Sequence, residues 1–360
     1  MNAPADPPAL AGMAGDPPTA LGAAPIRGLL RREPEDFRVD ERLGFAADGA
    51  GTHLLLRVEK RAANTGWVAA QLARLAAVPP REVGWCGHKD RYAVTTQWFS
   101  VPWPLRRPAE EALAFAGEGF AVLESARHGR KLRPGSHRGN GFEIRVHEIE
   151  GDSGALAARL AALAERGMPN YFGPQRFGRQ GANLARALRW ADGGQPPAGR
   201  AERGFALSAA RAVLFNRVLA DRIEHGSWDR LLPGEVVMLD GTQSFFKAPE
   251  IDAALHERAA RGDVHPSGPL CGRGLTPATG EAFAREEQAL RAGEPLVELL
   301  VAAGLAHERR ALRLRPGSLE WAVDGRTLCL RFDLPRGAFA TAVLHELVAG
   351  GWIGDGSGEE

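Results

Sequence analysis

Residues 87–91 (Gly-His-Lys-Asp-Arg) set one carboxylate, that of Asp90, among three basic or ionisable side chains. The segments at residues 82–86 and 93–101 flank it and are predicted to be strands. A loop between two strands is exposed to solvent while the strands hold its ends rigidly, and such loops often carry a reactive carboxylate. An ordinary turn, with Asp90 capping the bend and Lys89 and Arg91 in water, explains the same pattern and is favoured on this evidence alone.

A basic segment lies at residues 127–138, after a predicted strand at residues 122–126. It holds five Lys or Arg, two His and no acid, although the whole chain has a formal charge of only +1. A solvated loop would explain it. However, its prolines and glycines leave no helical face, and guanidinium and backbone N–H groups suit phosphates. The segment therefore indicates a local surface for a polyanion, and residues 139–142 (Gly-Asn-Gly-Phe) follow it.

A third segment, residues 169–181, combines three aromatic residues, two arginines and three glycines. Such a segment can stack on bases and clamp a nucleic-acid backbone. It can equally be a buried turn between domains, with Phe172 and Phe177 in a core. The sequence alone leaves both interpretations open.

Several classes of site find no support in the sequence. The ten His and three Cys are scattered without metal-ligand spacing, and neither a Walker nor a Rossmann phosphate loop nor a nucleophile elbow occurs. The residues thus predict chemistry by a lone carboxylate with aromatic side chains, acting on something polyanionic. A metal-dependent phosphohydrolase that uses His88 and Asp90 is a weaker alternative.

The length of 360 residues predicts two domains. Three unpatterned Cys suit a reducing cytoplasm, and the apolar runs are all shorter than a membrane span. Residues 1–25, rich in Ala, Pro and Gly, lack the features of a secretory signal and are predicted to be a disordered lead-in.

The order of elements predicts a split domain. Strands are expected at residues 37–41 and 53–60, a helix follows Asn64, and a helix at residues 153–166 ends at Gly167. Mostly helical segments then extend to about residue 310, and strands return after it. We therefore expect a strand-rich domain at residues 26–166 and 312–353, an insert at residues 167–311, and a loose tail at residues 354–360.

Taken together, these segments resemble the tRNA pseudouridine synthase D (TruD) family, in the family's order and over nearly the whole chain from residue 26 to 352. The motifs that carry the resemblance are Leu29-Leu30-Arg31 with Pro34-Glu35-Asp36-Phe37, Gly87-His88-Lys89-Asp90-Arg91 with Ala93-Val94-Thr95 and Gln97-Trp98, Arg127-His128 with Arg130-Lys131-Leu132-Arg133, Gly139-Asn140-Gly141-Phe142, Pro169-Asn170-Tyr171-Phe172-Gly173 with Gln175-Arg176-Phe177-Gly178, Ser208-Ala209-Ala210-Arg211 with Leu214-Phe215-Asn216, and Leu334-Pro335 with Gly337-Ala338-Phe339-Ala340-Thr341.

The resemblance implies an α+β fold. Its parts would be a pseudouridine-synthase catalytic domain with a mixed, largely antiparallel sheet and an inserted, mostly helical α/β TRUD domain. It implies isomerisation of uridine 13 in tRNA to pseudouridine, without a cofactor or a metal. We expect tRNA as the partner, no membrane association, a monomer and a cytoplasmic location. The alternative is a module of the same fold that binds or folds tRNA without catalysis.

The resemblance also implies roles for individual residues. Asp90 matches the family's catalytic aspartate, Asn140 and Phe142 match its Asn-x-Phe motif, and Phe339 matches the phenylalanine of its late motif. Arg31 occupies a position where the family often has Lys. It is expected to favour the ionised form of Asp90. Phe37 is also expected to bind substrate.

The predicted contacts to the RNA backbone are all basic residues. They are Lys89, Arg91, Arg127, Arg130, Lys131, Arg133 and Arg176. His88 stands where the family usually has Leu or Gln and is expected to point away from the site. Asp36 and Asp40 are rival carboxylates, but both lie in or beside strands where a solvent-facing acid is ordinary.

Overall fold

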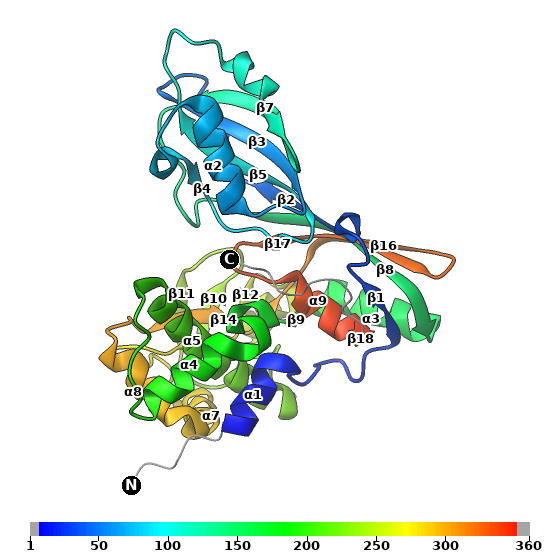
Figure 1. The fold of residues 1–360 in the computed structure, drawn as a ribbon. Coiled ribbons are helices and arrows are strands. Elements are labelled where there is room, and N and C mark those ends of the chain that lie inside the picture. The colour runs from blue at the N-terminus through cyan, green and yellow to red at the C-terminus, as the bar shows by residue number, and fades with distance from the viewer. Residues whose placement is uncertain (1–6, 351–360) are drawn as a thin grey trace. The chain divides into compact units, whose positions relative to one another are not determined.

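The computed structural model describes residues 7–350, and these divide into two compact units (Figure 1). The sheet unit comprises Arg27–Gly151 and Gly317–Gly337, with Gly350. The helical unit comprises residues 7–26, Asp152–Pro316 and Ala338–Ala349. Each unit is therefore assembled from segments that are far apart in the sequence.

The sheet unit is built on a mixed sheet. Its elements are β1 (Ile26–Leu30), β2 (Phe37–Arg42), β3 (His53–Arg61), α2 (Thr65–Ala76), β4 (Gly84–Trp85), β5 (Val94–Pro102), β6 (Ala116–Gly117), β7 (Phe120–His128), β8 (Gly139–Gly151), β16 (Gly317–Asp324) and β17 (Thr327–Pro335). The strand order is β16-β17-β8-β2-β5-β3-β7-β6. Along this path β2 and β5 pair in parallel and the other neighbours are antiparallel. This confirms the predicted α+β class with a mixed, largely antiparallel sheet.

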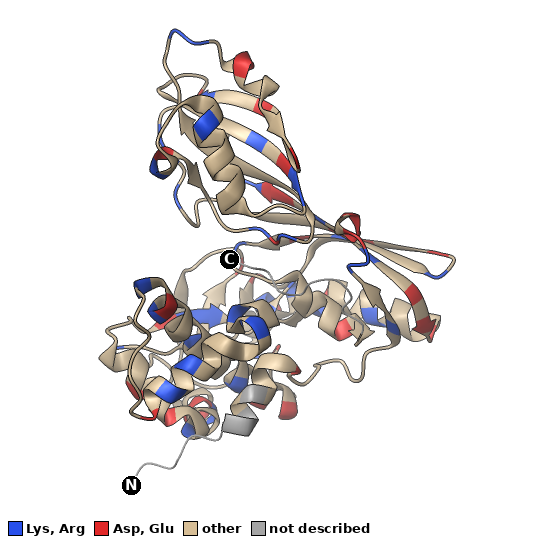
Figure 2. Ribbon diagram, in the orientation of Figure 1, with Lys and Arg blue, Asp and Glu red and all other residues tan. Residues whose placement is uncertain are grey.

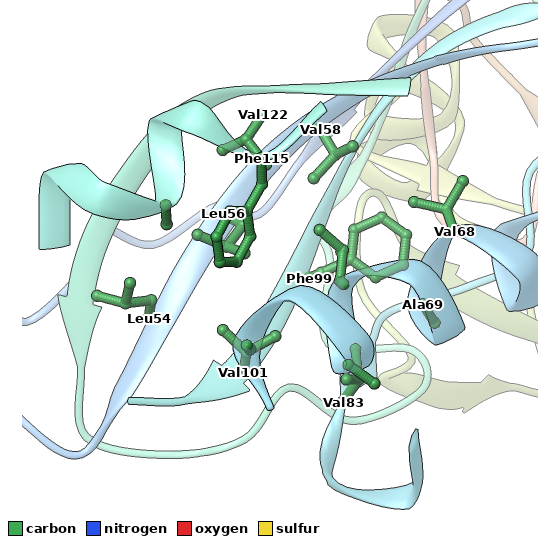
Figure 3. Packing of buried hydrophobic residues seen from close by; sticks show 14 of the residues in the cluster. Leu54, Leu56, Val58, Val68, Ala69, Val83, Phe99, Val101, Phe115 and Val122 are labelled. Atoms are coloured by element: carbon green, nitrogen blue, oxygen red, sulfur yellow. The ribbon is translucent and has the colours of Figure 1, made fainter. Parts of the chain in front are cut away.

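Helix α2 covers one face of β3 and β5. Leu54, Leu56 and Val58 alternate along β3 and are fully buried, as are Val68 and Leu72 of α2. Figure 3 shows Val68 and Ala69 close to Phe99 of β5. Burying each large aliphatic side chain contributes about 1.5–3 kcal/mol to the free energy of unfolding, so this core stabilises the sheet.

The helical unit holds the remaining elements. They are α1 (Pro7–Gly15), α3 (Ser153–Arg166), β9 (Met168–Pro169), α4 (Ala182–Ala191), α5 (Arg200–Glu224), β10 (Glu235–Leu239), β11 (Phe245–Ala248), α6 (Ala253–Arg261), β12 (Val264–His265), β13 (Ser267–Leu270), α7 (Gly280–Leu290), α8 (Glu294–Ala302), β14 (Glu308–Ala311), β15 (Arg313–Leu314), α9 (Ala340–Leu347) and β18 (Val348–Ala349). Helix α5 is its centre, because Val213, Leu214 and Phe215 on successive positions are all fully buried.

The N-terminal segment differs from its prediction. Residues 7–15 form α1, and Leu10 is fully buried in the same core cluster as Phe177 and Leu214. The expected disordered lead-in is therefore wrong for this segment, and residues 1–6 lie outside the described part of the chain. The first turn of a helix tolerates proline because its N–H groups have no partner within the helix, so Pro7 and Pro8 are compatible with a helix start.

The extents of the units also differ from the predicted domains. The units change at residues 26–27, 151–152, 316–317, 337–338 and 349–350, whereas the sequence predicted an insert bounded at residues 166–167 and 311–312 with all of residues 312–353 in the strand-rich domain. Helix α3 packs against α9, and both therefore join the helical unit. The tail at residues 354–360 lies outside the described residues. Within residues 7–350, no helix has both the length and the apolar character needed to cross a membrane.

Candidate active site

Asp90 lies on the loop between β4 and β5, which are held in the sheet on either side. Its Oδ2 accepts a hydrogen bond of 2.6 Å from Nη2 of Arg31. The Arg31 side chain is 9% exposed, whereas that of Asp90 is 37% exposed. The ion pair thus has a buried cationic side and an accessible carboxylate side, as a carboxylate that meets a substrate requires.

Arg31 follows directly after β1 and has a left-handed backbone, with φ of 58°. Such a conformation is uncommon for a residue with a side chain and persists where the surroundings fix it. The Arg31 guanidinium lies over the ring of Phe37, with 4.2 Å between Cζ and the ring centroid. Phe37 is 3% exposed, so it supports Arg31 from inside the fold.

Three phenylalanine side chains on neighbouring strands, those of Phe37, Phe142 and Phe332, lie next to one another beside Arg31. Phe142 of β8 lies opposite Phe332 of β17, and their rings stack at 5.4 Å. Phe37 meets Phe142 edge-on at 6.1 Å. Phe37 and Phe332 are buried and Phe142 is only partly so. Of the three, Phe142 therefore presents the accessible aromatic surface.

Lys89 and Asn140 form a second contact beside Asp90. The Lys89 ammonium donates to Oδ1 of Asn140 at 2.7 Å and lies 2.8 Å from Oε2 of Glu41. The side chain of Lys89 is only 7% exposed and that of Glu41 is fully buried. The Lys89 charge thus faces a buried carboxylate, and this ion pair ties the loop to β2 and β8; the contact of Lys89 with the RNA backbone stays a prediction.

The two rival carboxylates have structural partners. Asp36 is 4% exposed and accepts from the Glu33 N–H and from Nε2 of His147, so it is not the solvent-facing acid that was expected. Asp40 pairs with Arg57 at 3.0 Å. Its side chain alternates with Val39 and so lies on the other face of the sheet from the phenylalanines.

That other face carries a hollow of about 360 Å³ above Gly141. Arginines and acids line it, and they pair with one another, as Arg57 does with Asp40 and Arg42 with Asp333 at 3.1 Å. Figure 2 shows basic and acidic segments alternating on the strands of the sheet unit. This hollow is a solvated, internally paired surface, distinct from the surroundings of Asp90.

The comparisons with known proteins bear on the whole chain. The profile of the family "tRNA pseudouridine synthase D (TruD)" matches residues 18–185 and 203–347. The chain belongs to the TruD family. It is 48% identical to a tRNA pseudouridine synthase D of Nitrosococcus oceani, over 93% of this chain and 92% of that protein. It is 47% identical to that of Methylococcus capsulatus, over 92% and 94%.

The fold agrees with a solved structure of the same description. A tRNA pseudouridine synthase D (TruD) chain from Methanosarcina mazei superposes with a TM-score of 0.72, covering 96% of this chain and 99% of that one. The identity is 22%, so the likeness concerns the fold. The predicted resemblance to the TruD family, and the fold that it implied, are thus confirmed.

The predicted phosphate-binding residues of this TruD chain fall into two groups. Arg127 donates to the carbonyl oxygens of Gly51, Trp103, Pro104, Leu105 and Arg107, so its guanidinium closes a loop and does not face a ligand. Lys131 donates to the carbonyl of Arg81. Arg91, Arg130 and Arg133 are exposed. Exposure therefore suits these three to contact with phosphate, whereas the Arg127 guanidinium is occupied by backbone carbonyls; all of these contacts stay predictions.

Phe339 and Arg176 belong to the helical unit. Phe339 is the N-cap residue of α9, and its ring lies 5.8 Å from that of Phe172. The Arg176 guanidinium lies 5.5 Å from the Phe172 ring and 5.7 Å from the Phe339 ring, and donates to Ser208 Oγ at 3.0 Å. The structure thus gathers Asp90, Arg31, Phe37, Asn140 and Phe142 in one unit, and Phe339 with Arg176 in the other.

His88 is exposed, and its ring meets Trp85 edge-on at 5.9 Å. Among the residues that the structure describes, groups of three or more His, Cys, Asp or Glu that could hold a metal ion do not occur. The ligand group that a metal-dependent phosphohydrolase would need is therefore missing from residues 7–350.

Sequence reasoning missed three residues of this site: Glu41, Phe332, and Lys60, whose ammonium donates to the backbone carbonyl of Asp90 at 2.8 Å. Glu41 follows Phe37 and Val39 at alternate positions, and Lys60 follows Leu54, Leu56 and Val58 in the same way. Strand alternation therefore placed both charges on buried faces, and a buried charge in such a position indicates a function. Phe332 gave no such signal, because its place beside Phe142 depends on the pairing of β17 with β8.

Proposed function

We propose that this chain isomerises uridine 13 of tRNA to pseudouridine, with Asp90 as the catalytic carboxylate. Pseudouridine synthesis in tRNA is the reaction of the family to which the chain belongs. The observation that supports Asp90 most is its position: the carboxylate is 37% exposed, while the arginine that holds one of its oxygens is 9% exposed. The sheet unit would be the catalytic domain and the helical unit would contain the inserted TRUD domain.

The reaction breaks the N1–C1′ bond of uridine and joins C5 to C1′. In one route a carboxylate oxygen of Asp90 bonds to C1′ and uracil leaves with the electron pair; C5 of the turned uracil then attacks C1′, and the bond between C1′ and the Asp90 oxygen breaks, which returns the free carboxylate. In the other, the carboxylate removes a proton from C2′ as uracil departs, and C2′ regains a proton when C5 adds to C1′. In both, C5 finally loses its hydrogen and N1 gains one, so no co-reactant is consumed.

Both routes require an ionised Asp90 beneath a base that has left the stack. A base that covers Asp90 removes water from its carboxylate, and the Arg31 guanidinium 2.6 Å away supplies an opposite charge there. Because Arg31 is buried beside Phe37, this favourable charge stays in place when the substrate enters.

Phe142 is suited to hold the detached uracil. Its partly accessible ring is backed by Phe332 and Phe37, so it is a fixed platform. Stacking has no strong in-plane direction, which lets the uracil turn from N1 to C5 without losing contact. Phe339 remains a proposed substrate-binding residue on the strength of the family motif alone.

Asn140 is suited to read the edge of uracil. The Lys89 ammonium can only donate, so the Asn140 carbonyl oxygen must face it. The amide N–H₂ group is then directed elsewhere and can donate to a uracil carbonyl. The ion pair of Lys89 with Glu41 fixes this orientation, which gives Lys89 a positioning role.

Arg130 and Arg133 are proposed to contact phosphates. We expect Arg130→Ala and Arg133→Ala each to weaken tRNA binding and to lower the slope of log K against log salt by about 0.7–0.9. Binding measured between 50 and 200 mM salt checks this. Arg331→Ala removes a surface arginine that pairs with Glu143 on the other face and serves as the control. An unchanged slope for both loop variants would mean that the loop is an ordinary solvated segment without phosphate contacts.

The experiment that tests the position is the mapping of pseudouridine in unmodified tRNA after incubation with the protein. Carbodiimide adducts of pseudouridine stop reverse transcription, and the expected stop lies beside nucleotide 13. A tRNA with cytidine at that position should show none. A stop elsewhere would refute the assignment to uridine 13, and the absence of any stop would favour the non-catalytic tRNA-binding alternative.

A further inference from the structure

The backbone of the Asp90 loop is fastened by buried side chains. The Gly87 carbonyl accepts from Nε2 of Gln97 at 3.2 Å, and the Lys89 N–H donates to Oγ1 of Thr65 at 3.0 Å. The Thr65 hydroxyl in turn donates to Oε1 of Gln97 at 2.9 Å. Gln97 is fully buried and Thr65 is 1% exposed. The loop that carries Asp90 is therefore anchored to β5 and to the start of α2 by groups that solvent does not reach.

Lys60 makes the anchor closest to Asp90. It lies near the end of β3, and its side chain is fully buried. The ammonium donates to three backbone carbonyls: those of Ala63 at 2.7 Å, Asp90 at 2.8 Å and Lys89 at 3.4 Å. An ammonium has three N–H donors and no acceptor, so each donor has a carbonyl partner.

The charge of Lys60 is held in an apolar setting. Burial lowers its pKa from 10.5 to about 8, against the attraction of Asp90, which raises it, and with the repulsion of Lys89, which lowers it further. The strand neighbours of Lys60, Thr95 on β5 and Phe120 on β7, carry no charge. The two charged groups that face Lys60 are thus both on the Asp90 loop.

We propose that Lys60 is a positioning residue whose protonated ammonium holds the Asp90 loop in its reactive geometry, and that loss of this proton loosens the loop and slows the reaction. A neutral amine offers two donors and one lone pair. One of the three carbonyls would then lose its hydrogen bond and face a lone pair instead. The inference rests on the proposed role of Asp90, because it concerns the placement of that carboxylate.

The pH dependence of the free energy of unfolding distinguishes a loosened Asp90 loop from unfolding of the chain. The pKa of Lys60 is lower in the folded chain than its ordinary value of 10.5. Between about pH 8 and 10.5 the unfolded chain therefore binds more protons at this site, and the contribution of Lys60 to the free energy of unfolding rises with pH. A decline in activity above pH 8 from this cause would accompany no loss of stability from Lys60.

The test is the single-turnover rate of pseudouridine formation from pH 6.5 to 9.5 in the wild type, Lys60→Met and Lys60→Arg. With a pKa of about 8, about one molecule in thirty keeps the proton at pH 9.5, so we expect the wild-type rate to fall by about tenfold or more. Lys60→Met should be about tenfold or more slower at pH 7, with an unchanged Kd for tRNA, and its rate should show no such fall with pH. Lys60→Arg, which keeps its charge, should retain its rate at pH 9.5.

Lys247→Met changes an exposed lysine of the helical unit and is the control, which should match the wild type throughout. A flat wild-type profile would overturn the proposal. So would a wild-type fall that Lys60→Arg or Lys60→Met repeats, since the titration would then belong to the substrate or to another group. If Lys60→Met does not fold, the Lys60→Arg profile decides.

The Asp90→Asn variant distinguishes a failure of the proposed role of Asp90 from a failure of the proposed role of Lys60. If that variant stays active, the proposed function of Asp90 fails whatever Lys60 does. If it is inactive while the Lys60 variants keep the wild-type pH profile, only the role of Lys60 fails.

Discussion

Asp90→Asn is expected to reduce pseudouridine formation by about 10⁴-fold or more while tRNA binding stays within about twofold. The amide keeps the shape of the carboxylate and can still accept from Arg31, but it can neither attack C1′ nor remove a proton from C2′. The rate under saturating tRNA measures the first effect, and the Kd for tRNA measures the second.

Asp40→Asn is the matched control for this variant. Asp40 also pairs with an arginine, at 3.0 Å from Arg57, and its side chain is 40% exposed, close to the 37% of Asp90. It lies on the other face of the sheet, so the loss of its charge should leave the rate within about twofold. Comparable losses in the two variants would mean that the effect of Asp90→Asn is a general consequence of removing an acid from this sheet.

Arg31→Met is expected to lower the rate by about 10²–10³-fold, the usual cost of removing one electrostatic group from a preorganised site. Methionine can keep the contact with the Phe37 ring but supplies no charge to Asp90. The carboxylate would then lose its hydrogen-bond donor and the opposite charge beside it when the base covers it. Because Asp90 remains partly exposed, we expect a smaller effect on the free energy of unfolding than for a fully buried pair.

Two further variants test whether the charge at position 31 accounts for this loss of rate. Arg31→Lys should recover most of the rate, since it restores the charge. Arg32→Met removes the adjacent arginine, which is exposed and pairs with Glu148 at 3.2 Å, and should leave the rate unchanged. An Arg31→Met variant as active as Arg32→Met would show that Asp90 does not depend on its ion pair.

The loop that carries Asp90 could be predicted from the sequence because its signal is local, whereas the choice of Asp90 itself depended on the resemblance to the TruD family. A glycine, a carboxylate and two flanking strand patterns are contiguous, and the strands β4 and β5 do flank the loop. The helix predicted at residues 153–166 was equally local and is α3. Its membership of the helical unit was not, because it depends on packing against α9, almost two hundred residues further along the chain.

Two of the residues predicted to contact RNA show how little composition says about the direction of a side chain. Lys89 and Arg127 lie in basic segments and looked like phosphate contacts, but their charges are satisfied by Glu41 and by backbone carbonyls. Charge density in a sequence does not reveal which side chain turns inward. For Glu41 and Lys60 the strand alternation did contain that information, because each follows apolar residues at every second position.

The central claim, that Asp90 performs the isomerisation, is tested most directly by tritium release. Joining C5 to C1′ frees the hydrogen on C5 of uridine, whereas binding alone leaves it in place, so tRNA that carries 5-tritiated uridine reports the chemical step in a reaction without a methyl donor. With enzyme in excess and all tRNA bound, we predict release of one tritium per tRNA by the wild type and none above background by Asp90→Asn. Release by Asp90→Asn at a rate within tenfold of the wild type would contradict the proposed catalytic role of Asp90.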